Sequence, residues 1–244
     1  MTPTVSVVIP VRDDAPALRH CLAWLASQTV RPLEVIVVDN GSSDETVDVA
    51  RSYGARVVEE QAVGIPPAAA AGYDAATGDV IGRLDADSRA GRHWVEQVAR
   101  RMSDPHLDAV TGWGRFYDLP PGSRRLASLV YLGAYYLLCH LALGHTALWG
   151  SSMAVRRTAW REVRDRVHRD DPELHGDLDL AFVLGPRRRA RIDHRLRVGV
   201  SARSLRGRAQ RRRRLARARR TLETNWAVSP PWLRWRDRLA TPSR

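Results

Sequence analysis

The sequence contains no lysine. Its basic side chains other than histidine are 39 arginines, and the formal net charge is +12. It has only two cysteines, Cys21 and Cys139, which lie in apolar stretches without the spacing of a disulfide or metal pair. Isolated cysteines of this kind behave as small buried hydrophobic residues, which indicates a reducing, cytoplasmic setting. No basic region followed by an apolar stretch occurs near Met1, so the sequence predicts no secretory signal.

Two common ligand-binding patterns are also missing. The eight histidines include no His-Glu-x-x-His and no metal-ligand spacing with cysteine, which argues against a histidine-based metal site. Gly112-Trp-Gly114 is not followed by the third glycine of a dinucleotide-binding loop, which argues against a dinucleotide-dependent oxidoreductase.

The sequence does contain enough apolar residues for one full core. With 244 residues and 44% hydrophobic content, it fits a single α/β domain, residues 1–202, followed by an arginine-rich helical tail, residues 203–244. In the first 90 residues strand-like runs alternate with helix-like segments. This alternation is typical of βαβ units on a mainly parallel sheet flanked by helices.

The strand and helix signals place several loops at one edge of this sheet. The predicted strands are 5–9, 33–38, 56–59, 79–84, 109–116 and 149–157, and the predicted helices are 44–53, 67–76, 92–102, 177–184 and two that begin at Ala15 and Thr158. Ser42-x-x-Glu45 matches a capping box at the start of the 44–53 helix. Ligands in such sheets bind beyond the carboxyl ends of the strands, where residues 10–14, 39–43 and 85–88 fall.

One long segment, Leu126 to Gly144, has 19 residues without a formal charge. This length approaches the ~20 residues that span a bilayer. Serine, glycine, tyrosine and histidine interrupt the segment, however, and the same residues suit a core helix or a helix that lies on a membrane surface. The sequence leaves these three interpretations open.

The most informative motif is Asp85-Ala86-Asp87, directly after the 79–84 strand. Two carboxylates one residue apart are hard oxygen ligands for a divalent cation such as Mg²⁺ or Mn²⁺ that also binds a diphosphate. Such a cation neutralises a leaving diphosphate as a Lewis acid. The alternative is an N-cap cluster for the next helix, which needs only one of the two carboxylates.

Four motifs in order resemble the inverting family 2 glycosyltransferases, which transfer a sugar from a nucleotide-diphosphate donor. They are Val5 to Asp14, Val35 to Asp44, Asp85 to Asp87 and His175 to Leu180, and the resemblance covers residues 5 to 185. It implies a GT-A-like fold, a Mg²⁺ or Mn²⁺ held by Asp85 and Asp87, and a set of donor-binding residues. These are Pro10, Val11, Arg12, Asp14, Asp39, Gly64, Asp85, Ala86 and Asp87. From the residues alone, Asp39 also suits an Asx-turn.

The resemblance also implies an acceptor side. Gly176-Asp177-Leu178-Asp179-Leu180 matches the family's Glu-Asp-x-Asp-Leu motif with glycine in the glutamate position, which makes Asp177 the candidate base that takes the acceptor's proton. The alternative for Asp177 is an acidic residue favoured by the dipole at a helix N-terminus. The acceptor-side candidates are Trp149, Gly150, Ser151 and His175.

The sequence departs from the family at two places. Ala69 and Ala70 stand where the family usually has arginine and asparagine, which leaves the nucleotide unidentified. Gln210 to Arg214 has arginine in place of the tryptophan in the Gln-x-x-Arg-Trp motif of chain-polymerising members. We therefore expect non-processive, inverting transfer from a nucleotide-sugar donor to the hydroxyl of a lipid-linked or other glycan acceptor.

Arg203 to Arg220 contains ten arginines in eighteen residues, which allows other functions. A run of this kind binds nucleic-acid phosphates without sequence preference, but it does not explain the ordered acidic motifs, so no nucleic-acid partner is expected. A nucleotidyltransferase needs a glycine-rich loop with a basic residue, which Val11 to Asp14 lacks. Near anionic lipid each arginine contributes about 1 kcal/mol, which favours peripheral attachment at the inner face of the cell membrane.

Overall fold

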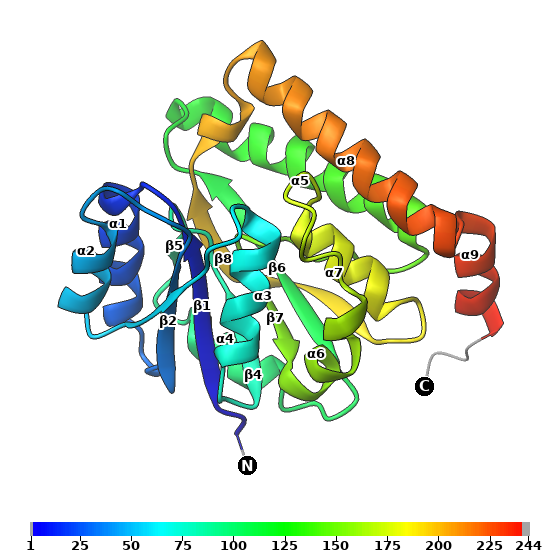
Figure 1. The fold of residues 1–244 in the computed structure, drawn as a ribbon. Helices are drawn as coiled ribbons and strands as arrows, with labels where there is room; N and C mark the ends of the chain where they lie inside the picture. The colour runs from blue at the N-terminus through cyan, green and yellow to red at the C-terminus, as the bar shows by residue number, and fades with distance from the viewer. Residues whose placement is uncertain (1, 241–244) are drawn as a thin grey trace.

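The computed structural model describes residues 2–240, apart from the side chains of residues 204 and 205. Its centre is an eight-stranded sheet with the order β3-β2-β1-β4-β7-β6-β8-β5 (Figure 1). The strands are β1 (Val5–Val11), β2 (Glu34–Asp39), β3 (Arg56–Glu59), β4 (Val80–Arg83), β5 (Arg89–Ala90), β6 (Ala109–Phe116), β7 (Met153–Arg156) and β8 (Ala190–Val200).

Strands β3, β2, β1 and β4 are parallel to one another in this sheet, and β6 is parallel to β8. β7 runs antiparallel between β4 and β6, and β5 runs antiparallel to β8. Val7, Val8 and Ile9 of β1 are fully buried, as expected for a parallel strand covered on both faces. The predicted α/β class with a mainly parallel sheet is therefore confirmed, although the sequence interpretation did not include β5 and β8.

Helices surround the sheet, with α3 in front of it and α4 behind it in the view of Figure 1. The helices are α1 (Ala15–Ala26), α2 (Thr46–Ser52), α3 (Ile65–Ala75), α4 (Trp94–Arg101), α5 (Pro121–Leu143), α6 (Arg157–Val163), α7 (Gly176–Leu184), α8 (Arg208–Val228) and α9 (Pro231–Ala240), with 3₁₀ turns at Arg164–Arg166 and Ala202–Leu205.

The capping box predicted for α2 is wrong. The helix begins at Thr46, and its N-cap residue, Glu45, makes no side-chain capping hydrogen bond. The Ser42 hydroxyl accepts a hydrogen bond from the backbone N–H of Asp13 at 3.0 Å instead. The Asp44 carboxylate accepts from the N–H of Ala15 at 3.0 Å. Contacts between the loops after β1 and β2 therefore override the local capping pattern.

The apolar segment forms α5, which is only half-buried. Its inner face packs on β6, where the Ser128 hydroxyl accepts from the N–H of Phe116 at 3.0 Å and the Tyr136 hydroxyl donates to the carbonyl of Gly112 at 2.6 Å. By length and composition alone, α5 qualifies as a candidate membrane span. Only 22% of its most apolar 18-residue stretch is buried inside the protein. The side of α5 that faces away from β6 is exposed, so α5 is not a helix buried in the core on all sides.

The chain after residue 202 folds back over the domain (Figure 1). α8 packs against both α5 and α7, and α9 packs against the end of α5. Thr221 and Asn225 of α8 are buried. The indole of Trp226 donates to the carbonyl of Ala142 at 3.2 Å. The basic helix is thus packed against the rest of the protein, while the division into domain and tail at residue 202 remains a prediction.

Candidate active site

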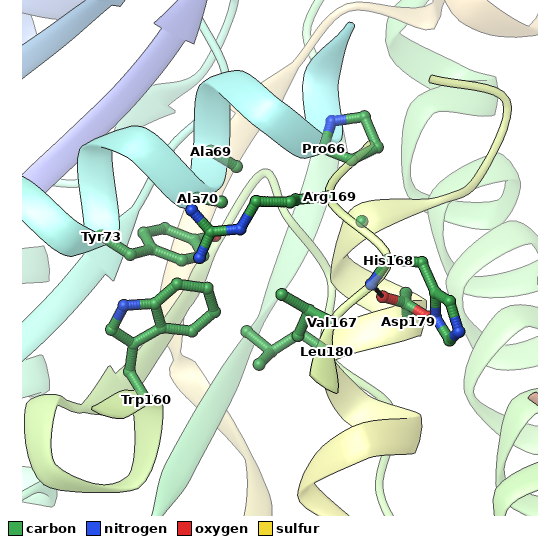
Figure 2. Close-up of a pocket in the computed structure, with 11 residues that line it drawn as sticks. Pro66, Ala69, Ala70, Tyr73, Trp160, Val167, His168, Arg169, Asp179 and Leu180 are labelled. Carbon is green, nitrogen blue, oxygen red and sulfur yellow. Dashed lines mark hydrogen bonds and ion pairs between the residues drawn. The ribbon is translucent and has the colours of Figure 1, made fainter. Parts of the chain in front are cut away.

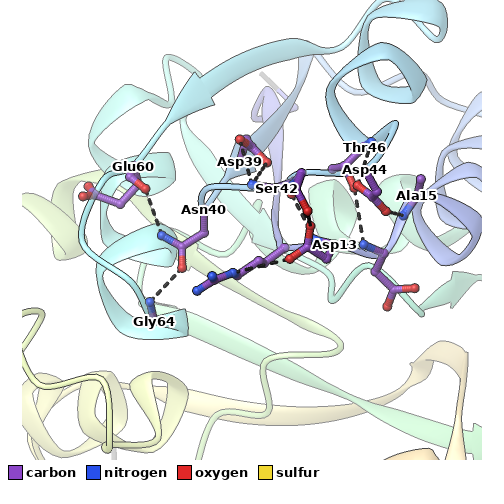
Figure 3. A network of polar contacts seen from close by, with 12 residues as sticks. Asp13, Ala15, Asp39, Asn40, Ser42, Asp44, Thr46, Glu60 and Gly64 are labelled. Carbon is purple, nitrogen blue, oxygen red and sulfur yellow. Dashed lines mark hydrogen bonds and ion pairs between the residues drawn. The ribbon is translucent and has the colours of Figure 1, made fainter.

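The loops after β1 and β2 form a hydrogen-bonded rim at the carboxyl edge of the sheet (Figure 3). Asp13 has φ of 49°, and its carboxylate accepts from the N–H of Ser43 at 2.7 Å. The buried Asp39 carboxylate accepts from the N–H of Ser42 at 3.2 Å, so this residue makes the Asx-type turn that was its alternative role. Contact of Asp39 with a donor remains a prediction.

Asn40 is a rim residue that the sequence interpretation missed. Its amide donates to the carbonyls of Glu60 and Ala62 at 2.9 and 2.8 Å, and its oxygen accepts from the N–H of Gly64 at 2.7 Å (Figure 3). Gly64 has φ of 146°, and a Cβ there would lie 2.8 Å from the Cβ of Pro172. Asn40 therefore fixes the loop that carries Gly64, and Gly64 acts through its backbone.

Pro10, Val11 and Arg12 lie at the end of β1, beside β2. Val11 pairs with Asp39, and its carbonyl accepts from the N–H of Asn40 at 3.0 Å. The Arg12 side chain is exposed, with its Nε 3.6 Å from the Asp13 carboxylate. The backbone of these residues is thus held in place, while the Arg12 guanidinium remains accessible to a ligand.

Asp85 and Asp87 face the same edge from the turn that follows β4. The Asp85 carboxylate accepts from the hydroxyl of Ser151 at 2.5 Å and pairs with Arg83 at 3.0 Å, and the intervening Ala86 is buried. The Asp87 side chain is 16% exposed and pairs with Arg203 at 3.2 Å. Burial and the nearby Asp85 charge raise the pKa of Asp87 to about 6.

Arg203 bridges two carboxylates of the site, since its guanidinium pairs with Asp14 as well as Asp87. Within residues 2–240 no group of three or more His, Cys, Asp or Glu side chains forms a ready metal cluster. A divalent cation is therefore limited to one or two carboxylates and completes its shell with diphosphate and water, as Mg²⁺ usually does. The carboxylates of Asp85 and Asp87 fit such a cation, since the positively charged Arg203 guanidinium already binds at this position.

Arg83 is a second site residue that the sequence interpretation missed. It lies buried at the end of β4, and burial acts to lower its pKa, but Tyr73, Asp85 and Asp177 raise the pKa above the usual arginine value. A Cβ at Gly150 would lie 2.7 Å from the Arg83 Cζ, so only glycine leaves room for the guanidinium. An arginine inside the apolar 79–84 strand was the available signal.

Asp177 lies across the site from Asp85, at the start of α7. Its carboxylate accepts from the N–H of Gly150 at 2.7 Å and of Leu178 at 2.9 Å. Burial acts to raise its pKa, but the Arg83 charge and these hydrogen bonds together lower the pKa of Asp177 below the usual aspartate value. The side chain is therefore an ionised carboxylate at neutral pH.

The turn before β7 connects the two acidic sides. β7 runs antiparallel to β4 with Met153 opposite Arg83, which puts residues 149–152 at the same edge as Asp85. Gly150 donates its N–H to Asp177, and Ser151 donates its hydroxyl to Asp85. Gly150 and Ser151 thus lie in the predicted site. The Trp149 ring is buried instead and packs directly against Gly114 of β6.

The second aspartate of the downstream motif, Asp179, points toward His168 (Figure 2). The Asp179 side chain accepts from the N–H and ring nitrogen of His168 at 2.9 and 2.8 Å, and from the Asn225 amide of α8 at 2.8 Å. The cavity beside it has a volume of about 20 Å³. That volume suits a single water, so it is not a nucleotide site.

His175 is held by α8. Its N–H donates to the hydroxyl of Thr221 at 3.0 Å, and its ring Nε2 lies 3.2 Å from the carbonyl of Arg214. Burial lowers the pKa of His175 below the usual histidine value. It is therefore neutral at physiological pH, and its role on the acceptor side remains a prediction.

A mixed sheet with an acidic pair after β4 and a helix-opening aspartate across the edge defines a GT-A-like nucleotide-diphospho-sugar transferase fold. A solved structure of mannosyltransferase PcManGT from Pyrobaculum calidifontis, in complex with GDP-Man and Mn²⁺, superposes with a TM-score of 0.70 at 20% identity, over 98% of this chain and 70% of that chain. Glucosyl-3-phosphoglycerate synthase from Mycobacterium tuberculosis, in complex with Mn²⁺, UDP and glucosyl-3-phosphoglycerate, superposes with a TM-score of 0.62 at 20% identity, over 93% and 81%.

The family model described as Glycosyl transferase family 2 matches residues 6–164, which is more than half of the chain, so the chain belongs to this family. Among curated proteins, glycosyltransferase AglE from Haloferax volcanii is 33% identical over 118 residues, which cover 45% of this chain and 39% of AglE. The matched region thus spans well under half of that relative. The predicted family and fold are both confirmed.

Proposed function

We propose that this protein transfers a sugar from a nucleotide-diphosphate donor to an acceptor hydroxyl with inversion of configuration. The observation that carries the proposal is the short path across the site, from Asp85 through Ser151 and Gly150 to Asp177. It supports a role in cation binding for Asp85 and Asp87 opposite the ionised carboxylate of Asp177. Inverting transfer needs these two functions on opposite sides of the reacting sugar.

The donor side uses Asp85 and Asp87 for a divalent cation. When bound, Mg²⁺ or Mn²⁺ neutralises the leaving diphosphate. Two proteins of the same fold were solved with Mn²⁺ and either GDP-Man or UDP, which supports this choice of cation and donor class. Arg12 and Arg203 lie at the same edge and supply further positive charge for the diphosphate.

The acceptor side uses Asp177 as the base. The carboxylate is ionised before substrate binds, which is the protonation state that accepts a proton. An anionic donor adds negative charge to the site, which acts to raise the pKa of Asp177 toward the working range. Gly150 and Leu178 hold the carboxylate through their N–H groups, so its orientation is set in advance.

The acceptor that we propose is a lipid-linked or other glycan hydroxyl, and the transfer is non-processive. Arg214 occupies the place of the tryptophan in the motif of chain-polymerising members, and its side chain donates to the hydroxyl of Tyr131. In the described part of the chain, α5 alone meets the length and composition of a membrane-spanning helix. Residues 2–240 therefore contain no series of such helices.

The test is a thermal-shift panel of UDP-, GDP- and TDP-sugars, each with Mn²⁺, with Mg²⁺ and with chelator. A ligand at a hundred times its Kd stabilises a protein by about 2.7 kcal/mol, so the correct donor class should raise the Tm only when the cation is present. NMR of the product made from that donor should show the inverted anomer. Absence of a cation-dependent shift with every donor, or a retained anomer, would contradict the proposal.

A further inference from the structure

The outer face of α5 carries a continuous stripe of apolar side chains. Its large members are each 55–65% exposed and are Leu126, Leu129, Val130, Leu137, Leu138 and Leu141. Their spacing of three, four and seven residues places them on one side of the helix, with Gly133 and Ala134 in the gap. Contiguous exposed apolar surface of this kind marks a contact site, whereas single apolar residues scattered over a surface do not.

The inner face of α5 packs against the protein, where Ser128, Leu132, Tyr136 and Leu143 are buried. Tyr136 bonds to the backbone of β6, and Tyr135 donates to the carbonyl of Leu148 at 2.5 Å, next to the turn that carries Gly150. Lipid therefore cannot surround α5 on all sides while this fold persists. A helix with one face in the protein and one apolar face outward matches an orientation in the plane of a membrane surface.

α8 runs beside α5 in the same direction (Figure 1). Arg214 of α8 reaches Tyr131, and Trp226, twelve residues further along α8, reaches the carbonyl of Ala142, eleven residues further along α5. The first turns of α8 therefore flank the first half of the apolar stripe. Arg208, Arg211 and Arg212 lie in these turns, and all three are exposed.

Internal contacts occupy most of the arginine run. Six of its ten arginines contact other parts of the protein, namely Arg203, Arg206, Arg213, Arg214, Arg217 and Arg220, and a seventh, Arg219, pairs with Glu223 within α8. Arg208, Arg211 and Arg212 have no acidic or hydrogen-bonding side-chain partner within residues 2–240. Within the arginine run, the charge available to an external partner is thus concentrated beside the apolar stripe.

We propose that the α5 stripe, together with Arg208, Arg211 and Arg212, forms a docking face for an anionic lipid bilayer. The leucines and Val130 enter the headgroup and acyl boundary, and the three guanidinium groups bind lipid phosphates, a charge complementarity that a neutral partner lacks. α5 also carries Tyr135, which donates to Leu148 beside the turn whose Gly150 binds Asp177, so docking brings this side of the site close to the membrane surface. This role is independent of the donor and cation assignments.

The test is cosedimentation of the full chain with vesicles of phosphatidylcholine alone and with 30% phosphatidylglycerol. The double variant Val130→Glu/Leu137→Glu should lower the partition coefficient on anionic vesicles at least tenfold, with an unchanged Tm, because both side chains are solvent-exposed. Leu33→Glu is the matched control: Leu33 is 55% exposed and lies between α1 and β2, outside the docking face. Its binding should stay within twofold of wild type.

A second variant tests the charges. Arg208→Gln/Arg211→Gln/Arg212→Gln should lower binding to anionic vesicles at least tenfold and leave the weaker binding to neutral vesicles unchanged. Arg31→Gln/Arg51→Gln/Arg92→Gln removes the same charge from exposed positions outside the docking face and should change binding less than threefold. Truncation after Ala202 is unsuitable, because it removes Thr221 and Asn225 from the contacts of His175 and Asp179.

Three results would overturn the proposal. The first is wild-type protein that does not sediment with anionic vesicles. The second is retention of binding by the Val130→Glu/Leu137→Glu variant. The third is a wild-type dimer in size-exclusion chromatography that this variant dissociates while vesicle binding is absent, since a second copy of the chain would then cover the stripe. A cation-dependent Tm shift with a nucleotide-sugar would be unaffected by any of them, which separates failure here from failure of the proposed activity.

Discussion

The chain contains two Asp-x-Asp segments of the same length, residues 85–87 and 177–179, and they have different roles. The first follows a strand and turns at the sheet edge, so Asp85 and Asp87 both face the site. The second opens a helix, in which residues two apart point to nearly opposite sides. Asp177 therefore faces the site, whereas the Asp179 side chain is 3% exposed and held in the interior. The backbone that carries an acidic pair decides whether both members are available to a ligand.

Asp177→Asn should have the largest effect. It removes the basic group while keeping the shape, so transfer to acceptor should fall by roughly 10² to 10⁴, with donor affinity preserved. The measurement is initial-rate transfer beside donor titration by calorimetry. Asp179→Asn is the matched control and should retain transfer per folded molecule. Undiminished transfer by Asp177→Asn would contradict the different roles proposed for Asp177 and Asp179.

Asp87→Asn should abolish the cation dependence of donor binding. Donor affinity of the wild type is expected to fall by at least about tenfold when Mn²⁺ is chelated, because the diphosphate loses its counter-charge. The variant should bind weakly and equally with and without Mn²⁺ in calorimetry. Asp48→Asn, an exposed change on α2, should behave as wild type. Full cation dependence in Asp87→Asn would remove this residue from the proposed metal site.

Asp179→Asn should destabilise the fold without touching the chemistry. It weakens charge-assisted hydrogen bonds to His168 and Asn225, so the free energy of unfolding should fall by about 1–3 kcal/mol. Urea denaturation followed by circular dichroism measures this. Asp165→Asn is the control, since its side chain is 87% exposed and should change stability by less than about 0.5 kcal/mol. Equal stability of the two variants would show that the Asp179 contacts contribute little.

The smallest effect concerns pH. Because burial and the Asp85 charge raise the pKa of Asp87 to about 6, a proton competes with the cation below that pH. Mn²⁺ affinity should be constant above about pH 7 and fall by up to about tenfold per unit below pH 6. The Arg203 charge lowers the pKa of Asp87, so Arg203→Gln should move the midpoint to higher pH. A midpoint that stays in place or moves down would show that Arg203 does not act on Asp87.

The two acidic segments also differ in how much of their surroundings could be predicted from the sequence. On the donor side, strand patterns and loop positions in the first 90 residues predicted the edge where Asp85 and Asp87 lie, because a parallel sheet gathers the carboxyl ends of its strands. Arg83 and Asn40 were missed, although a charge within an apolar strand was visible. β8 was missed as well, despite the alternating Leu196, Val198 and Val200, because its exposed positions are rich in arginine and histidine.

The sequence by itself determined the family, the α/β class and the edge of the sheet that carries the acidic motifs, since these follow from local periodicity and motif order. Only the tertiary structure decided which partners each polar side chain has. Ser151 and Asp85 are 66 residues apart, and Asn225 and Asp179 are 46 apart. It also decided that α5 keeps one apolar face outward and that most of the arginine run is paired internally. Such contacts depend on how distant elements pack, and no local pattern records that packing.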